Sequence, residues 1–463
     1  MSQDDQKLRI MRDEKIPKAL LKLGLPTMIG MLVSALYSVV DTYFVSGLGT
    51  SQVGAISIVF PIVQIVIGLA MMFGTGAASY ISRLLGEGNT KQANHTASTA
   101  VVSSLAVGAV AIAVALCFLD NILIGLGATE TILPYASAYA VIYISGSLFN
   151  IFNVTMNNVI TAEGAAKFTM ISMLIGGALN VILDPIFIYP LGFGIEGAAI
   201  ATVLSQVVTT LFYVWYLLRK KGYLRFSLRS VAFDGTIYAQ ILKVGGATLV
   251  YQLLTSVALA LTNTAASQYG DSAVAGLGVV ARVMTIGSYV VFGYMKGFQP
   301  VAGYNYGAKK YGRLKDAIKL SLIGSTVFCI VVALIMIIIP EQIVSLFGKD
   351  DATMIQIGVQ ALRANGIMFA FFGFEMVFMA LFLALGRGKE GGLLSISRQG
   401  LCFIPAILIM PALLGISGII YAQPVADLLT VILTAIFAVM LSRQLKVLRE
   451  RSNQIEERME EAL

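Results

Sequence analysis

The amino-acid sequence predicts an all-α membrane protein whose twelve transmembrane helices form two pseudo-symmetric lobes of six. Three observations lead to this prediction: an apolar composition, repeated apolar runs of membrane-spanning length, and an internal duplication. Of the 463 residues, 57% are hydrophobic and 12% are charged, whereas soluble domains carry about 25% charged residues. A soluble globular protein is therefore excluded.

Apolar runs of bilayer-spanning length recur from one end of the chain to the other. A helix needs about 20 such residues to cross the hydrocarbon core, and twelve runs are close to or above this length. They lie at residues 17–42, 52–78, 94–118, 133–160, 168–189, 194–218, 238–262, 273–299, 316–340, 352–385, 393–414 and 416–441. A polar, mixed-charge segment from Ser2 to Lys15 precedes the first run, which therefore does not resemble a cleaved signal peptide.

The basic residues fall on alternate loops and so predict the orientation. One side collects Lys7, Arg9, Arg12, Lys15, Lys18, Lys22, Arg83, Lys91, Lys167, Arg219, Lys220, Lys221, Arg225, Arg229, Lys309, Lys310, Arg313, Lys315, Arg387, Lys389, Arg398 and the tail from Arg443 to Arg458. The opposite loops contain a single basic residue, Lys349. By the positive-inside rule, both termini are predicted to be cytoplasmic. The net charge of +7 then follows from topology, and no nucleic-acid partner is needed to explain it.

The third observation is a repeat whose matching positions keep a constant offset in residue number, which we call the repeat offset. It relates Gly49, Ser51 and Val53 to Gly270, Ser272 and Val274, and likewise Gly24 to Gly245, Gly86 to Gly307, Pro190 to Pro411, and Gly194, Ile195 and Gly197 to Gly415, Ile416 and Gly418. Chance matches would scatter over many offsets, so the constant value indicates duplication. Because each copy has six spans, both copies enter from the same face, as in transporters built from parallel repeats.

The repeat divides the chain into five predicted segments. They are a cytoplasmic N-terminal segment (1–15), an N-lobe with spans one to six (16–218), a cytoplasmic linker (219–236), a C-lobe with spans seven to twelve (237–441) and a cytoplasmic C-terminal tail (442–463). Binding sites in such folds lie between or within the lobes, near helices interrupted by Gly or Pro. The matched interrupted pair here is DPIFIYP at 184–190 and IPAILIMP at 404–411.

Asp41 and Asp184 are acids inside predicted spans, and the duplication does not repeat them. The repeat offset carries Asp41 to Thr262 and Asp184 to Pro405. If the scaffold required a carboxylate at these positions, the other copy would need one too. The asymmetry therefore favours a functional role for the two acids over a structural one.

The two acids are also predicted to lie at one depth. They follow the last cytoplasmic lysine of their spans by nineteen and seventeen residues, which places both roughly 25–29 Å from the cytoplasmic face. Tyr37 and Asn180 each lie four residues before an acid and share its helix face, and Thr202 reaches a similar depth in the sixth span. Two carboxylates in a low-dielectric pocket require a proton or a cation. The cluster predicts a coupling site for H⁺ or Na⁺; the alternative is that Asp41 is a hydrated residue at the end of its helix.

Several segments resemble the multidrug and toxic compound extrusion (MATE) transporters. They are GLPTMIGMLVSALYSVVDTYFVSGLG, ASYISRLLGEGN, ITAEGAAK, ALNVILDPIFI and GFQPVAGYNYGAKK, and the resemblance, closest to the DinF and MepA branch, covers essentially the whole chain. It implies two six-helix bundles that face a central cavity. It further implies alternating access and export of organic cations or other amphipathic drugs by antiport.

The resemblance also implies functional residues. The coupling-ion site of the branch carries over to Asp41, Asn180, Asp184 and Thr202. Tyr37 would belong to its hydrogen-bond network, and the backbone carbonyl of Ala198 would join the site if the ion is Na⁺. Another branch has an acid in the seventh span, but YQLLTSVALALT contains none here, so no ion site is expected there.

Two further features of the family concern the fourth and the first span. Asn157 is placed in the ion network of the family, although its depth in this chain favours Asn153 or Asn150 on the same helix face. Pro26 lies where family members bend the first helix, and it is a candidate hinge. Whether H⁺ or Na⁺ drives transport stays open, since both prefer carboxylate, carbonyl and hydroxyl oxygens.

Other charged residues lie inside predicted spans of the C-lobe. They are Arg282 and Lys296 in the eighth span, Arg363 and Glu375 in the tenth, and Asp427 in the last. One interpretation is a substrate or gating site, with Glu375 attracting a cation or Lys296 an anionic group. The other, which we favour, is a structural ion pair of Glu375 with Lys296 or Arg282.

The remaining polar features suggest no catalytic chemistry. Glu163 is expected to pair locally with Lys167, and the only histidine, His95, is expected at the surface near the cytoplasm. The glycines of GRGKEGG at 386–392 match no phosphate-binding spacing. No disulfide or metal spacing joins the cysteines, which lie in apolar runs at Cys117, Cys329 and Cys402.

The sequence therefore predicts a secondary multidrug exporter that is not an enzyme and uses no cofactor beyond its coupling ion. Its expected partners are drug-like small molecules and the lipid bilayer, and we expect a monomer in the cytoplasmic (inner) membrane of the cell. One alternative is a lipid-linked precursor flippase of the same superfamily, although such proteins typically have more spans or a strongly basic cavity. A membrane-embedded enzyme is the other, and it would need a catalytic constellation near a membrane face.

Overall fold

The structure is a computed structural model that describes residues 3–219, 222–347 and 351–461. The described residues form helices and loops without any β-strand, and twelve helices are long and apolar enough to cross a membrane. The predicted all-α class and number of spans are confirmed. Lys220, Lys221 and Lys349, which entered the charge count, lie outside the described residues.

The first half of the chain forms α1 to α8. These helices are α1 (Gln3–Arg12), α2 (Ile16–Ser46), α3 (Thr50–Gly86), α4 (Thr90–Cys117), α5 (Leu119–Gly125), α6 (Leu133–Ala162), α7 (Ala166–Ile188) and α8 (Gly194–Leu218). The second half contains η1 (Leu228–Ser230), α9 (Gly235–Ser267), α10 (Asp271–Gly307), α11 (Tyr311–Ile338), α12 (Pro340–Ser345), α13 (Ala352–Ala384), α14 (Gly388–Ile396), η2 (Ser397–Leu401), α15 (Phe403–Leu414) and α16 (Ile416–Glu461).

Local sequence explains where several of these helices begin. Asn89, Asp234 and Asp351 are N-caps whose side-chain oxygens accept a backbone N–H two or three residues later, at 2.8–3.1 Å. The turns before α3 and α10 place Gly49 and Gly270 at φ values of 127° and 90°, which residues with a side chain rarely adopt. Because these two glycines are repeat-related, the two copies of the duplication use the same turn.

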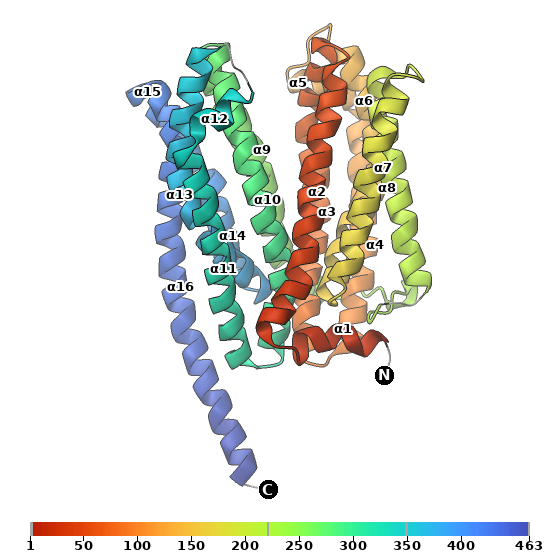
Figure 1. Cartoon of the computed structure of the whole chain (residues 1–463). Helices are drawn as coiled ribbons and strands as arrows, with labels where there is room; N and C mark the ends of the chain where they lie inside the picture. The colour runs from red at the N-terminus through yellow and green to blue at the C-terminus, as the bar shows by residue number, and fades with distance from the viewer. Residues whose placement is uncertain (1–2, 220–221, 348–350, 462–463) are drawn as a thin grey trace.

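Figure 1 shows the helices of the two halves as separate groups, α2 to α8 and α9 to α16. In the first group, α3 packs against α4 and α6, and α7 packs against α2 and α8. In the second, α13 packs against α10, α11 and α16. The two groups meet where α2 contacts α10, α3 contacts α9 and α3 contacts α10. The interface thus pairs the first span of each copy with the second span of the other, as a pseudo-twofold relation requires.

Repeat-related glycines allow these helices to approach closely. A Cβ atom on Gly297 of α10 would lie 2.5 Å from the Cα of Gly24 on α2. A Cβ on Gly76 of α3 or on Gly245 of α9 would clash with a backbone oxygen of the opposite half. The repeat offset relates Gly24 to Gly245 and Gly76 to Gly297, so the duplication built the interface from equivalent small residues.

The helices differ most from the predicted spans in three respects. α3 and α10 continue eight residues past the predicted ends at 78 and 299, because helical structure extends beyond the apolar run. The eleventh span consists of α14, the π-helical turn η2 and α15, and Arg398 lies buried within it. The assignment of Arg398 to a cytoplasmic loop was therefore wrong. α16 runs without a break to Glu461, so the last span and the tail form one helix.

Both ends of the chain lie at the same end of the molecule, which we call the terminal end (Figure 1). α1 lies across this end, and the last part of α16 projects beyond it (Figure 1). Which side of a membrane the terminal end faces, and the segment boundaries inferred from the repeat, stay predictions.

Candidate functional site

A cluster of polar side chains joins α7 to α8 within the first half. Asp184 on α7 is fully buried, and the side-chain nitrogen of Asn180, one helical turn earlier, donates to its Oδ1 at 3.0 Å. The same nitrogen lies 3.3 Å from the hydroxyl oxygen of Thr202 on α8. A spacing of four residues places Asn180 and Asp184 on one helix face, and Asn180 bridges this acid to α8.

Asp41 approaches the cluster from α2, which packs against α7. The carboxyl groups of Asp41 and Asp184 lie close enough to interact electrostatically. No lysine, arginine or histidine in the described ranges forms an ion pair with either acid. Two carboxyl groups this close repel each other when both are charged, so the arrangement favours a shared proton or cation.

Three oxygens of this cluster are buried without a hydrogen-bond donor in the described part of the chain. They are Oδ1 of Asp41, Oδ1 of Asn180 and Oδ2 of Asp184. Buried polar atoms in folded proteins are nearly always paired, so three unpaired acceptors in one place require an explanation. Carboxylate and amide oxygens are the ligands that hard cations prefer, and a proton on one carboxyl group supplies a donor for the other.

Tyrosines surround the acids. Tyr37 on α2 and Tyr139 and Tyr143 on α6 all lie within electrostatic range of Asp41, and the rings of the α6 pair stack with centroids 5.9 Å apart. Tyr139 and Tyr143 were not among the residues predicted for this site. Their depth is nevertheless visible in the sequence, because the fourth span enters from the opposite face and reaches the depth of Asp41 near its beginning.

Two of the candidate asparagines of α6 form hydrogen bonds with residues outside this cluster. The side chain of Asn153 donates to Oε1 of Gln206 at 2.8 Å and accepts from Thr210 at 2.9 Å. Asn157 donates to the hydroxyl of Tyr213 at 3.0 Å. Neither of the two amides bonds to Asp41, Asn180, Asp184 or Thr202, so the structure does not bring them into the cluster directly. Oδ1 of Asn150, the third candidate, is buried without a partner among the described residues.

The two remaining first-half candidates lie within helices. Ala198 is buried in α8, one turn before Thr202. Pro26 lies inside α2, which continues through it. Beside the proline, the hydroxyl of Thr27 donates to the backbone oxygens of Leu23 and Gly24, both at 2.9 Å. Proline lacks the N–H that would otherwise donate to the carbonyl of Lys22, one turn earlier, which lowers the cost of bending the helix at this point.

The intramembrane basic residues of the second half have different surroundings. The Lys296 side chain on α10 reaches across the interface and donates to Oδ1 of Asn157 on α6. Arg282 on α10 and Arg363 on α13 are exposed on the molecular surface. Lys296 is thus part of the contact between the halves, and Arg282 shares no contact with it.

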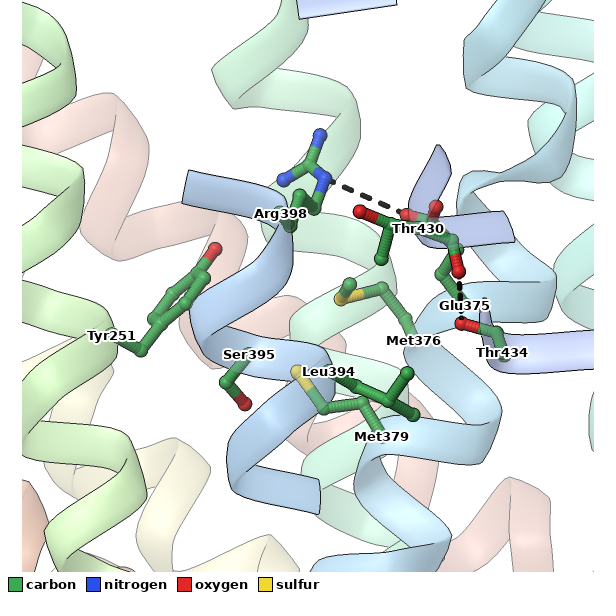
Figure 2. A pocket seen from close by; sticks show the side chains of 9 residues that line it. All are labelled: Tyr251, Glu375, Met376, Met379, Leu394, Ser395, Arg398, Thr430 and Thr434. Atoms are coloured by element: carbon green, nitrogen blue, oxygen red, sulfur yellow. Dashed lines mark hydrogen bonds and ion pairs between the residues drawn. The ribbon is translucent and has the colours of Figure 1, made fainter. Parts of the chain in front are cut away.

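Glu375 forms an ion pair with Arg398, a residue that was predicted to lie in a cytoplasmic loop. Its Oε2 lies 3.6 Å from Nε of Arg398, which also donates to Oδ1 of Asp427 at 3.1 Å. Figure 2 shows Arg398 of η2 extended toward Glu375 of α13, with Tyr251 of α9 on the other side. The favoured pairing of Glu375 with Lys296 or Arg282 was wrong, because Arg398 is buried in the eleventh span rather than in a loop.

The cluster of Glu375, Arg398 and Asp427 occupies positions whose repeat-related residues in the first half are uncharged. The repeat offset carries Gln206 to Asp427, and it carries Thr202 to Gln423, whose amide donates to Asp427 at 2.6 Å. The same offset relates Val154 to Glu375 and Gly177 to Arg398, so the charged groups of the second half have uncharged counterparts in the first. Within the described residues, no group of three or more His, Cys, Asp or Glu side chains is arranged to hold a metal ion.

A duplicated bundle of twelve membrane-crossing helices, with unpaired acids buried in one half, defines a multi-pass membrane transporter rather than an enzyme. Residues 26–186 and 247–409 each match the MatE family, and the repeat offset relates the starting positions of these two segments. The chain belongs to the MatE family of MATE transporters.

Individual relatives agree with this assignment. The chain is 30% identical over 450 residues to the multidrug export protein MepA of Staphylococcus aureus (strain MRSA252), an alignment that covers 96% of this chain and 98% of MepA. It is also similar to a crystal structure of a MATE in complex with MaL6, with a TM-score of 0.90, 28% identity and coverage of 96% of this chain and 99% of the other. A multidrug resistance MATE transporter of the MOP superfamily in an outward-facing conformation matches with the same TM-score, identity and coverage.

Proposed function

We propose that this protein is a secondary active multidrug exporter that exchanges organic compounds, mainly cationic or amphipathic, for H⁺ or Na⁺. The name of its relative MepA supports the export of drugs. The observation that carries the coupling proposal is the set of three buried, unpaired oxygens on Asp41, Asn180 and Asp184. The protein would act as a monomer in the cytoplasmic membrane and need no cofactor besides the ion.

The coupling ion would bind between α2, α7 and α8. Asp41 and Asp184 would provide its charge partners, and Asn180 would hold Asp184 in position. For Na⁺, the hydroxyl of Thr202 and the carbonyl of Ala198 lie on the adjacent helix. Neutralising the two acids removes their repulsion, so binding would draw α2 and α7 together around the tyrosine ring of Tyr37.

α2 would carry this movement to the interface between the halves. The helix contains Asp41 near one end, and it packs against α10 near Gly24 and Pro26. Proline removes one backbone hydrogen bond and lowers the cost of bending. We propose that binding at Asp41 changes the bend of α2 at Pro26 and with it the α2–α10 contact. Lys296 and Asn157, which join the halves beside this contact, would separate and rejoin in each cycle.

The terminal end of the interface is held by polar contacts. Arg83 on α3 donates to the backbone oxygen of Ala384 at 3.1 Å and to Oε1 of Gln240 at 3.0 Å. Ser79, one turn earlier, donates to the backbone oxygen of Leu383. We propose that this end opens in the second state of an alternating-access cycle, after these contacts break.

The experiment that tests the coupling site is dye efflux from proteoliposomes. The wild type and the Asp41→Asn variant are compared under an imposed pH gradient and, separately, an imposed Na⁺ gradient. Wild-type protein is expected to export a fluorescent cationic dye under one of the two gradients. The gradient that drives efflux identifies the coupling ion. Asp41→Asn keeps the shape of the side chain but removes its charge, so it is expected to lower driven efflux at least about tenfold.

The matched control is Asp271→Asn, which changes an exposed acid at the start of α10 and is expected to leave efflux unchanged. Normal efflux by Asp41→Asn under both gradients contradicts the proposed coupling site. Absence of efflux by the wild type under either gradient contradicts the proposed exporter activity itself.

A further inference from the structure

The N-terminal helix α1 is short but firmly attached. Ten residues are too few for a stable isolated helix, so packing must set its position. Leu8 and Met11 are buried, with 8% and 0% of their surface exposed, and both belong to the hydrophobic core that contains residues of both halves. Figure 1 shows α1 lying across the terminal end of the bundle.

The first attachment of α1 is to the first half. The ammonium group of Lys7 donates to the hydroxyl of Tyr216 on α8 at 2.7 Å and lies 4.9 Å from the centre of its ring. The hydroxyl of Tyr216 in turn donates to Oε1 of Glu163, in the loop between α6 and α7. A Cβ atom on Gly164 would lie 2.8 Å from the backbone oxygen of Lys7, so only glycine lets α1 come this close.

Glu163 holds Tyr216, the partner of Lys7, in position. Its carboxyl group is buried, with 1% of the residue exposed, and its Oε2 accepts the backbone N–H of Leu224 at 2.9 Å. Burial raises the pKa of Glu163, while the charge of Lys7 and the bonds from Leu224, Tyr216 and Tyr223 oppose this rise. The expected local pair of Glu163 with Lys167 was wrong, because the Glu163 carboxylate accepts hydrogen bonds from Tyr216 on α8 and Leu224 in the linker and interacts with the charge of Lys7 on α1.

The second attachment of α1 is to the other half. Nη2 of Arg313 on α11 donates to the backbone oxygens of Glu14 at 2.7 Å and Met11 at 3.3 Å. Nε of the same guanidinium donates to Oδ1 of Asn305 on α10 at 3.1 Å, and the amide of Asn305 donates to the Met11 oxygen at 3.4 Å. The last carbonyls of a helix lack partners within the helix and attract positive charge. Arg313 therefore holds the C-terminal end of α1.

We infer that α1 and the turn at 13–15 form a clasp that holds the terminal end of the transporter closed. One arm is the Lys7–Tyr216–Glu163 contact with the first half, and the other is the Arg313–Asn305 contact with the second. The halves cannot separate at this end unless one arm releases. Because only three residues separate α1 from α2, the released arm remains linked to the helix that carries Asp41.

This inference rests on the proposed function, since it assigns the residues that control one step of the cycle. Its test measures a distance and needs neither substrate nor gradient. The three native cysteines are replaced, and spin labels are attached at Lys91→Cys on α4 and Lys389→Cys on α14, both exposed. Double electron–electron resonance then gives the distance distribution between the halves of the purified full-length chain in lipid nanodiscs.

Loss of either arm is expected to add a population with a longer distance. Arg313→Gln removes charged hydrogen bonds to two carbonyls, and it is expected to shift the open-to-closed ratio by about tenfold. Tyr216→Phe removes one hydroxyl from the opposite arm and is expected to act in the same direction. If Arg313→Gln does not give folded protein, the Tyr216→Phe variant alone tests the clasp. The matched control is Lys315→Gln, an exposed residue of the same helix, which should leave the distribution unchanged.

Distance distributions of the arm variants that match the wild type overturn the clasp, whatever the transport assay gives. A longer distance in the arm variants, together with no gradient-driven efflux by the wild type, supports the clasp and rejects the proposed exporter. Failure of one proposal is thus distinguishable from failure of the other.

Discussion

At the scale of single residues, the two halves treat buried acids in different ways. In the first half, Asp41 and Asp184 lie close together, and no basic side chain among the described residues pairs with them. In the second half, Glu375 and Asp427 share Arg398, whose guanidinium also lies 4.6 Å from the ring of Phe372. An unpaired acid can bind and release a cation at low cost, whereas an acid held by arginine contributes mainly to structure. The charge pairing thus favours the first half as the coupling site.

This difference predicts that Arg398→Met strongly destabilises the protein. The substitution leaves Glu375 and Asp427 buried without their cation, a change that typically costs about 3–5 kcal/mol. We expect a clearly lower midpoint of thermal unfolding in detergent, measured by tryptophan fluorescence or by loss of the monodisperse peak after heating. Arg363→Met is the control, since Arg363 is an exposed arginine of α13 and its removal should shift the midpoint little. Equal midpoints for the two variants would show that the ion pairs are energetically unimportant.

At the scale of helices, the contact between the halves depends on glycine. α2 and α10 cross where Gly24 faces Gly297, and α3 and α9 cross at the repeat-related positions Gly245 and Gly76. Helices without side chains at the crossing approach closely and gain dispersion contacts along the groove. A pair of helices that fits this tightly has little tolerance for intermediate separations, which suits an interface with two discrete states.

The glycine contact predicts opposite effects for two alanine substitutions on α10. Gly297→Ala places a Cβ atom 2.5 Å from the backbone of Gly24, so the helices must separate, with an expected cost of about 1–3 kcal/mol. Gly278→Ala meets nothing within 4 Å and should gain up to about 1 kcal/mol from the better helix propensity of alanine. Thermal unfolding of both variants checks the sign. A stabilising Gly297→Ala would contradict the close crossing.

At the scale of the whole molecule, the duplication explains the shape and the charges predict its orientation. Both copies have six spans, and the terminal end contains α1 and the projecting part of α16 (Figure 1). The short helices α5 and α12 lie at the opposite end of the molecule (Figure 1), where α5 connects α4 to α6 and α12 connects α11 to α13.

The positive-inside rule predicts which residues a membrane-impermeant thiol reagent reaches. In a background without native cysteines, Lys91→Cys should react in intact cells only after the membrane is permeabilised. Glu130→Cys, in the exposed loop before α6, should react from outside. Labelling is measured by a mass shift on a gel. The reverse pattern would place both termini outside and require a different account of the basic loops.

The sequence by itself determined the features that depend on local composition and spacing. Runs of apolar residues fix the number of spans because every backbone polar group in a bilayer must be satisfied within a helix. The constant repeat offset established the duplication, and the lack of repeat-related counterparts singled out Asp41 and Asp184. The four-residue spacing placed Asn180 on the face of Asp184, and the hydrogen bond between them follows from that spacing.

Only the tertiary structure decided which distant side chains meet. Arg398 was counted with the basic loop residues although it lies near the beginning of the predicted eleventh span, and the π-helical turn η2 buries it between Glu375 and Asp427. Glu163 has a nearby lysine in sequence but bonds to Tyr216 and Leu224, more than fifty residues away. Periodicity gives the direction of a side chain from its own helix, whereas its partner depends on how several helices pack together. The polar cluster of Asp41, Asn180, Asp184 and Thr202 was therefore accessible from the sequence, and the contacts of α1 and the Arg398 ion pairs were not.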